Sequence, residues 1–258
     1  MISHGGASSQ VNNYVQEGTK VLGRVTGSLL VLESLLATVP FFVLGAVFEF
    51  PDILRKSADE VLPLFAQNRG VIVPTYYVFM LSSVLLIPLA LLLRRVIVGM
   101  GPSSVLLDIA TTFGVTAGVT QFLGFVRWPF MIPYLAQTYL DPASSPATRD
   151  AVSVVYEGFN RYAGMAIGEH LGWLFLGLWL VAVSFAVFRR LNRWLGGAAL
   201  LLGVCFLVSI GEQFGGSAAP LFATANLVAN TLWSFWLIVA AIVVWRRDDM
   251  NAPSRSGR

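Results

Sequence analysis

Apolar residues gather in six long runs along the chain, separated by short polar or basic segments. The runs fall at about 25–48, 71–93, 103–126, 163–188, 195–214 and 221–245. A helix needs about 20 apolar residues to cross roughly 30 Å of hydrocarbon, and each run meets that length. The pattern therefore predicts an all-α, polytopic membrane protein in which six transmembrane helices form one bundle.

The polar flanks of these runs suggest a simple division of the chain. Residues 1–20 lack an apolar core followed by a cleavage site, so we expect a disordered cytoplasmic tail rather than a signal peptide. Residues 21–247 are expected to form the six-span membrane domain. Residues 248–258 are polar and are expected to form a second cytoplasmic tail.

Two of the expected connections, 49–70 and 127–162, are long. In the first, Ser57 and Glu60 have the spacing of a capping box. In the second, Ser145 and Pro146 mark a helix start. Apolar residues then recur at helical spacing: Val152, Val155, Tyr156 and Phe159. We expect an amphipathic helix at the membrane interface that leads into the fourth span; an ordinary folded loop is the alternative.

Charge sets the expected orientation in the membrane. Only 12% of the residues are charged, against about 25% in soluble domains, and the net charge is +3. The basic residues flank the apolar runs, which indicates membrane orientation rather than nucleic-acid binding. One side would carry eleven of them: Lys20, Arg24, Arg94, Arg95, Arg189, Arg190, Arg193, Arg246, Arg247, Arg255 and Arg258. The other side would carry six in longer loops, so both termini are expected in the cytoplasm.

Polar side chains interrupt four of the spans at a similar depth. The outer halves of these spans, and their outer boundary, contain Gln121, Arg127, Glu169, His170, Glu212, Asn226 and Asn230. With a rise of about 1.5 Å per residue, these groups would lie within the outer ~15 Å of the membrane. A charge at the bilayer centre costs about 2.5 kcal/mol or more, so they are expected to face a wet pocket.

Three interpretations of this group are open. Glu169 and Glu212 could form structural ion pairs with Arg127 or Arg161. They could instead form a ligand or proton site with His170, since histidine titrates near neutral pH. The groups could also be scattered and never meet. In the inner half, Glu33 and Asp108 are candidates for a second polar site, which together with the outer group would outline a path across the membrane.

Glycine stripes indicate where helices approach closely. Gly164, Gly168 and Gly172 recur every four residues in the fourth span, and Gly114 and Gly118 follow Ala110 in the same way in the third. Small residues at this spacing let two helix backbones come close together. We expect the two stripes to pack on one another.

The sequence offers little catalytic chemistry. Cys205 and Ser209 are the nucleophile candidates near the polar group, without a protease motif around them, and the single cysteine excludes an internal disulfide. A metal site of Glu169, His170 and Glu212 is disfavoured because adjacent helical residues diverge by about 100°. No cofactor and no metal are expected.

Two stretches resemble a known family. They are "LGFVRWPFMIPYLAQTYLDP" and "FNRYAGMAIGEHLGWLFLGLW", with Arg127-Trp128-Pro129 in the first and Gly168-Glu169-His170-Leu171-Gly172 in the second. Over most of its length the chain is similar to the bacterial membrane family called domain of unknown function 4386. The resemblance implies a multi-pass protein of the bacterial cytoplasmic (inner) membrane, and it brings no established activity or cofactor.

The functional expectation is a binding or transport protein with an outward-facing polar pocket. Its partners would be the lipid bilayer and a small-molecule, ion or lipid ligand, with no nucleic acid; the sequence does not indicate an oligomeric state. A structural or regulatory membrane protein without turnover is the alternative, and an intramembrane enzyme is disfavoured.

Overall fold

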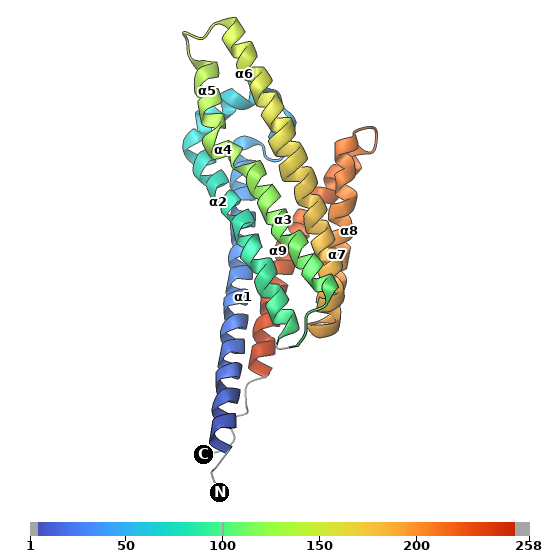
Figure 1. Cartoon of the computed structure of the whole chain (residues 1–258). Helices are drawn as coiled ribbons and strands as arrows, with labels where there is room; N and C mark the ends of the chain where they lie inside the picture. Colours follow the sequence, from blue (N-terminus) through green and yellow to red (C-terminus); the bar gives the residue numbers. More distant parts are fainter. Residues whose placement is uncertain (1–4, 100, 251–258) are drawn as a thin grey trace.

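The computed structural model describes residues 5–99 and 101–250, with side chains from 17 to 99 and from 101 to 247, and it is built from helices (Figure 1). Six helical runs among these residues are long and apolar enough to cross a membrane. The predicted all-α architecture with six spans is confirmed. The helices are α1 (Gly5–Phe48), α2 (Ala58–Val98), α3 (Val105–Phe125), α4 (Arg127–Phe130), α5 (Ile132–Leu140), α6 (Pro146–Phe159), α7 (Gly172–Arg190), α8 (Arg193–Ser209) and α9 (Ala219–Met250), with shorter or irregular segments η1 (Asp52–Arg55), η2 (Asn160–Leu171) and η3 (Ile210–Phe214).

The long helices close into a ring. α1 packs on α2, α2 on α3, α3 on α7, α7 on α8, α8 on α9, and α9 returns to α1. The start of α1 and the end of α9 lie at one end of the bundle, which we call the terminal end (Figure 1). The connections η1, α4–α6 and η3 lie at or towards the other end, which we call the loop end.

The N-terminal stretch 1–20 was expected to be a disordered tail, whereas α1 begins at Gly5 in the structure. Once a helix is nucleated, each further residue adds one backbone hydrogen bond, so an apolar span extends readily into polar sequence. For the same reason α9 continues to Met250, into the expected C-terminal tail. Residues 1–4 and 251–258 of the two expected tails lie outside the described residues.

The first long connection, expected at 49–70, is shorter in the structure because the second span begins before its apolar run. α2 begins at Ala58, and only Asn68 inside it has a non-helical backbone (φ −112°, ψ 16°). Ser57 precedes the helix, but the expected capping box does not form. The Ser57 hydroxyl donates to the carboxylates of Asp59 and Glu60 instead of accepting from a backbone N–H.

The second long connection is helical too, and it contains the expected amphipathic helix. α6 begins as expected, with the Ser145 hydroxyl accepting from the N–H of Thr148. It then continues through η2 into α7 as a single run, so it leads into the fourth span (Figure 1). Its apolar face, with Val152 and Tyr156, is buried against α2 and α5.

Two apolar cores hold the bundle together. The larger runs along its length and includes Trp179 and Trp233, whose ring centroids lie 6.0 Å apart. The smaller, at the loop end, is centred on Tyr76 and Trp128, which stack with ring centroids 4.7 Å apart. Large apolar side chains such as Phe42 are exposed on the outside of the ring, where lipid would cover them.

Glycines let η2 and the start of α7 pack closely on α3. A Cβ atom on Gly168 of η2 would lie 2.8 Å from the Cα of Gly124 in α3, and one on Gly172 would lie 2.8 Å from Cγ of Gln121. The stripe of the fourth span therefore packs on α3, as expected from its spacing.

The other stripe has different neighbours, so the two stripes do not pack on one another. A Cβ on Gly118 would meet the backbone oxygen of Ser83 in α2, and one on Gly114 would meet Ala90 and the ring of Trp179. α3 lies between α2 and α7 in the ring, so it uses one face of small residues for each neighbour.

Replacing Gly168 by leucine is expected to lower the thermal stability of the detergent-solubilised protein. The side chain would have to separate two backbones, and overpacking costs about 1–3 kcal/mol. Gly158→Leu is the control, because a Cβ there meets nothing within 4 Å. Equal melting temperatures for the two variants would contradict the close contact of η2 with α3.

Candidate functional site

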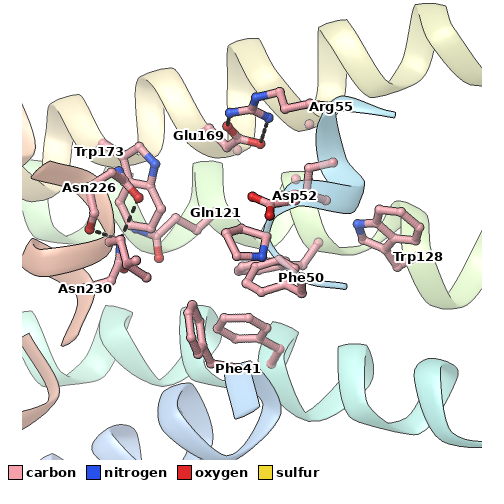
Figure 2. A pocket seen from close by; sticks show the side chains of 18 of the residues that line it. Phe41, Phe50, Asp52, Arg55, Gln121, Trp128, Glu169, Trp173, Asn226 and Asn230 are labelled. Atoms are coloured by element: carbon pink, nitrogen blue, oxygen red, sulfur yellow. Dashed lines mark hydrogen bonds and ion pairs between the residues drawn. The ribbon is translucent and has the colours of Figure 1, made fainter. Parts of the chain in front are cut away.

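A cavity of about 160 Å³ lies inside the ring, in its loop-end half (Figure 2). Segments α1, η1, α2, α3, α4, η2, α7, η3 and α9 contribute to its wall. Six of the seven side chains singled out by their depth line it: Gln121, Arg127, Glu169, Glu212, Asn226 and Asn230. Polar groups far apart in the sequence therefore meet around one space.

Aromatic rings form much of the remaining wall. The aromatic lining residues are Phe41, Phe50, Tyr76, Phe79, Phe125, Trp128 and Trp173. Figure 2 shows Phe41 and Phe50 facing the side of the cavity that carries Arg55 and Glu169. The cavity thus combines an apolar surface with a charged one.

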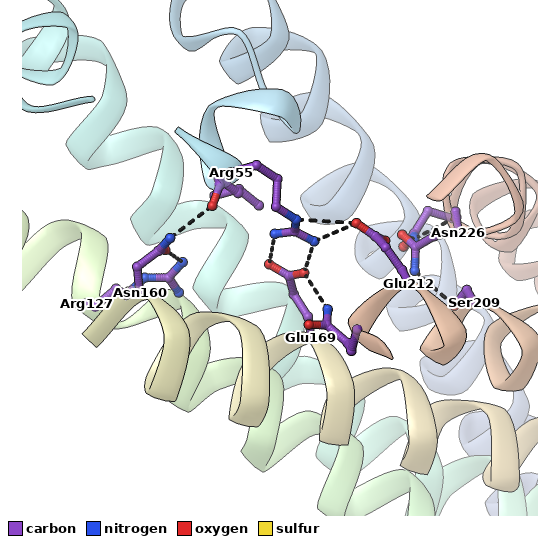
Figure 3. Close-up of polar contacts among 10 residues, drawn as sticks. Arg55, Arg127, Asn160, Glu169, Ser209, Glu212 and Asn226 are labelled. Atoms are coloured by element: carbon purple, nitrogen blue, oxygen red, sulfur yellow. Dashed lines mark hydrogen bonds and ion pairs between the residues drawn. The ribbon is translucent and has the colours of Figure 1, made fainter. Parts of the chain in front are cut away.

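Arg55 of η1 forms the main charged contact (Figure 3). Its two terminal nitrogens bind both carboxylate oxygens of Glu169, at 2.6 and 3.1 Å. The same guanidinium binds Oε1 of Glu212 at 2.9 Å, and Gln213 donates to Glu169 at 3.5 Å. A single arginine therefore links η1, η2 and η3.

Burial disfavours the charged form of Arg55, but the hydrogen bonds and charges of Glu169 and Glu212 outweigh it and raise the pKa of the guanidinium. Arg55 therefore stays positively charged over the whole physiological range. Arginine suits this position because its planar fork can bind a carboxylate with two parallel hydrogen bonds.

Neither arginine expected to pair with the glutamates does so. Arg161 points outward, is paired with Glu157 at 3.7 Å, and has a side chain that is 75% exposed. Arg127 is buried, and it donates to the carbonyl oxygen of Gly124 and to Oδ1 of Asn160. Of the interpretations left open by the sequence, a structural ion pair is the one seen, and its cation is Arg55 of η1.

A hydrogen bond from Asn160 holds η1 beside the glutamates. Its amide nitrogen donates to the backbone oxygen of Leu54 at 2.9 Å, while its amide oxygen accepts from Arg127 (Figure 3). Both contacts are buried. The residue next to Leu54 is Arg55, so this bond holds the arginine beside Glu169.

Two asparagines of α9 form a second polar wall. The amide nitrogen of Asn230 donates to Oδ1 of Asn226 at 2.9 Å, and the Asn226 amide donates to the hydroxyl of Ser209 at 3.2 Å. Both asparagines, which were expected at the outer level of the sixth span, thus lie between α8 and the cavity. The Ser209 hydroxyl accepts from Asn226 and donates to the backbone oxygen of Phe206.

His170 is the candidate that does not line the cavity. Its ring lies 6.4 Å from that of Phe214, centroid to centroid, and its Nδ1 has no hydrogen-bond partner among the described residues. Within the described part of the chain, no hydrogen bond joins His170 to Cys205 or Ser209, so no nucleophile and base are paired there. No group of three metal-ligating side chains occurs among those residues either.

The second, inner site is not assembled. Asp108 lies in the first turn of α3, bonded to Arg94 at 2.6 Å and to Ser103 at 2.7 Å. Glu33 is buried in α1, and its Oε2 has no hydrogen-bond partner among the described side chains. α1 packs mainly on α2 and α9, whereas Asp108 is on α3, so nothing in the described contacts links the two.

A family model described as "Domain of unknown function (DUF4386)" matches residues 25–241, which include all or part of each of the six spans. The chain belongs to this family. The resemblance found in the sequence is thereby confirmed, together with the multi-pass membrane character. No curated protein and no solved structure matches the chain.

Several residues of the DUF4386 cavity could not be found from hydrophobic periodicity. Arg55 and Asp52 belong to a short connection, where no repeat predicts which way a side chain points. Asn160 carried one usable signal, because it lies four residues before Gly164 on the same glycine stripe. No sequence signal predicted the π-helical hydrogen bonding of η2. Such segments are rare in proteins, but those that occur are often at functional sites.

Arg55→Met is expected to destabilise the DUF4386 protein, because it leaves Glu169 and Glu212 facing each other without a cation. The expected loss is about 1 kcal/mol, since the network is partly exposed. Adding Glu169→Gln and Glu212→Gln should restore much of it. Thermal unfolding in detergent measures both effects.

Lys56→Met is the matched control. Lys56 is the next residue, and its ion pairs with Glu49 and Glu60 are at the surface. We expect little change in melting temperature for this variant. A melting temperature for Arg55→Met equal to that of Lys56→Met would show that the Arg55 network contributes no stability.

Proposed function

We propose that this DUF4386 protein binds a small amphipathic molecule in the cavity and serves its transport. One observation carries the proposal: polar groups from α3, η2, η3 and α9 converge with aromatic rings on a single enclosed space. Small-molecule sites are typically concave and mainly apolar, with a few placed polar groups that fix orientation.

The size of the cavity limits the ligand. Its volume is about 160 Å³. An apolar cavity of about 150 Å³ in another protein binds benzene, so the space here suits a molecule with about one ring or a short chain. A lipid could place only its head or the end of a chain in it.

The Arg55 network supports a gating role at the loop end. It joins three separate segments, and the Arg55 side chain is 36% exposed. Partly exposed ion pairs contribute about 0–1 kcal/mol each, so this network can break and reform at small cost. A contact of that kind suits a cover over a binding site, which must open for exchange.

The distribution of basic residues supports an orientation in which both termini face the cytoplasm and the cavity faces outward. Arg94 and Arg189 belong to the dense basic group at the terminal end, and the loop end has longer, less basic connections. Together with the family, this favours the bacterial cytoplasmic membrane.

Labelling of single cysteines tests the orientation. Two variants are made in a Cys205→Ser background, Ala143→Cys and Pro102→Cys. Ala143 lies between α5 and α6, Pro102 lies between α2 and α3, and both residues are exposed. An impermeant thiol reagent applied to intact cells should label Cys at 143 and leave that at 102 unlabelled. The reverse pattern would place the cavity on the cytoplasmic side.

Native mass spectrometry of gently solubilised protein tests the binding itself. Ala223 lines the cavity, and Ala223→Phe should fill part of it and abolish a bound mass seen with the unaltered protein. Thr224→Phe is the control, because Thr224 is the next residue, is exposed and does not line the cavity. Identical spectra for both variants would contradict a ligand in this space.

A structural or regulatory role without turnover is the second candidate. It is favoured by the Arg55 network, in which Arg55 binds both Glu169 and Glu212 without a ligand. Copurification with another membrane protein, with no small molecule bound, would favour this role. Uptake of the bound molecule by proteoliposomes would favour transport.

A further inference from the structure

Three hydrogen-bond donors around the cavity have no hydrogen-bond partner among the described residues. They are the Tyr76 hydroxyl, the amide nitrogen of Gln121 and Nε of Arg127, and each is a buried atom on a residue that lines the space. A buried polar group without a partner costs about 1–3 kcal/mol. Three of them around one cavity indicate that a molecule rich in acceptors completes the site.

The charge of Arg127 also indicates a ligand that supplies hydrogen-bond acceptors. The residue is only 7% exposed, and no ion pair among the described residues includes it. Its acceptors are the neutral oxygens of Gly124 and Asn160, and its guanidinium carbon lies 5.1 Å from the ring centroid of Trp128. A buried cation of this kind is stable only when an anion lies close to it.

Three acidic side chains line the cavity, and none of them forms an ion pair with Arg127: Asp52, Glu169 and Glu212. Glu169 and Glu212 bind Arg55 instead. Arg127 therefore lines the cavity without a direct bond to any carboxylate of the described residues. Acceptors supplied by a bound molecule would give Arg127 and the other two donors the partners that they lack.

We propose that the cavity binds the anionic head of a small amphipathic acid, with its carboxylate or phosphate oxygens on Arg127, Tyr76 and Gln121. The apolar body of the acid would pack against the rings of Phe79 and Trp173, which also line the space. This inference rests on the proposed binding function and names its ligand class. A free organic acid and the head of an anionic lipid share this chemistry.

Calorimetric titration of the detergent-solubilised protein tests the charge preference. The probes are benzoate, benzyl alcohol and benzylamine, which share one ring and differ in charge. Benzoate should bind at least tenfold more tightly than benzyl alcohol, and benzylamine should bind most weakly. In nanodiscs, phosphatidic acid that displaces benzoate would identify a lipid head as the source of the anion; no displacement, compared with phosphatidylcholine alone, would identify a free acid.

Two tyrosine variants test the contact. Tyr76→Phe removes an unpartnered hydroxyl on the cavity wall, and Tyr156→Phe removes one that is equally buried but does not line the cavity. Neither change breaks a hydrogen bond within the described protein, so both variants should fold. Tyr76→Phe should weaken benzoate binding about tenfold, the equivalent of 1.4 kcal/mol, and Tyr156→Phe should leave it unchanged.

The outcomes separate this inference from the proposed function. Unchanged benzoate affinity in Tyr76→Phe, or tighter binding of benzylamine than of benzoate, would overturn the anion site. Binding of benzyl alcohol that Ala223→Phe abolishes would still support a small-molecule cavity. Failure of all three probes to bind would overturn both.

Discussion

The contact between Arg55 and the two glutamates joins three segments at the loop end of this protein. One guanidinium ties η1 to η2 and η3. It also resolves the cost of placing Glu169 within a long apolar helix, because it binds both carboxylate oxygens. A bidentate pair of this kind fixes distance and direction together. Together with the bond from Asn160 to Leu54, it holds η1 over the bundle as one wall of the cavity.

Close backbone packing supplies the second constraint. Gly124 of α3 and Gly168 of η2 leave no room for a side chain between them. Since Gly168 immediately precedes Glu169, this contact holds the carboxylate at a fixed height along the ring. Four residues before Gly168 in η2, Gly164 leaves room for the guanidinium of Arg127, which a Cβ at this position would strike. Small residues therefore position the charged groups as well as the helices.

The two arginines consequently have different electrostatic situations although both line one cavity. Arg55 has two carboxylates and partial contact with water, so it is balanced without a ligand. Arg127 is buried with neutral acceptors and an aromatic ring. The family of unknown function to which the chain belongs gives no activity, so this difference is the most specific chemical feature that the structure offers. It separates the contact that we propose to open from the site that we propose to receive an anion.

Hydrophobic periodicity alone was sufficient to predict the six spans, because membrane burial acts on each apolar run separately. Depth along those runs also predicted that Gln121, Glu169, Glu212 and the asparagines of α9 lie at one level. The partner of Glu169 could not be predicted in this way. Arg55 lies in a short connection whose path depends on contacts with Asn160, more than a hundred residues away in the sequence. Local sequence therefore determined which groups are available along each span, whereas tertiary packing decided which charges meet and left Arg127 without an ion pair among the described residues.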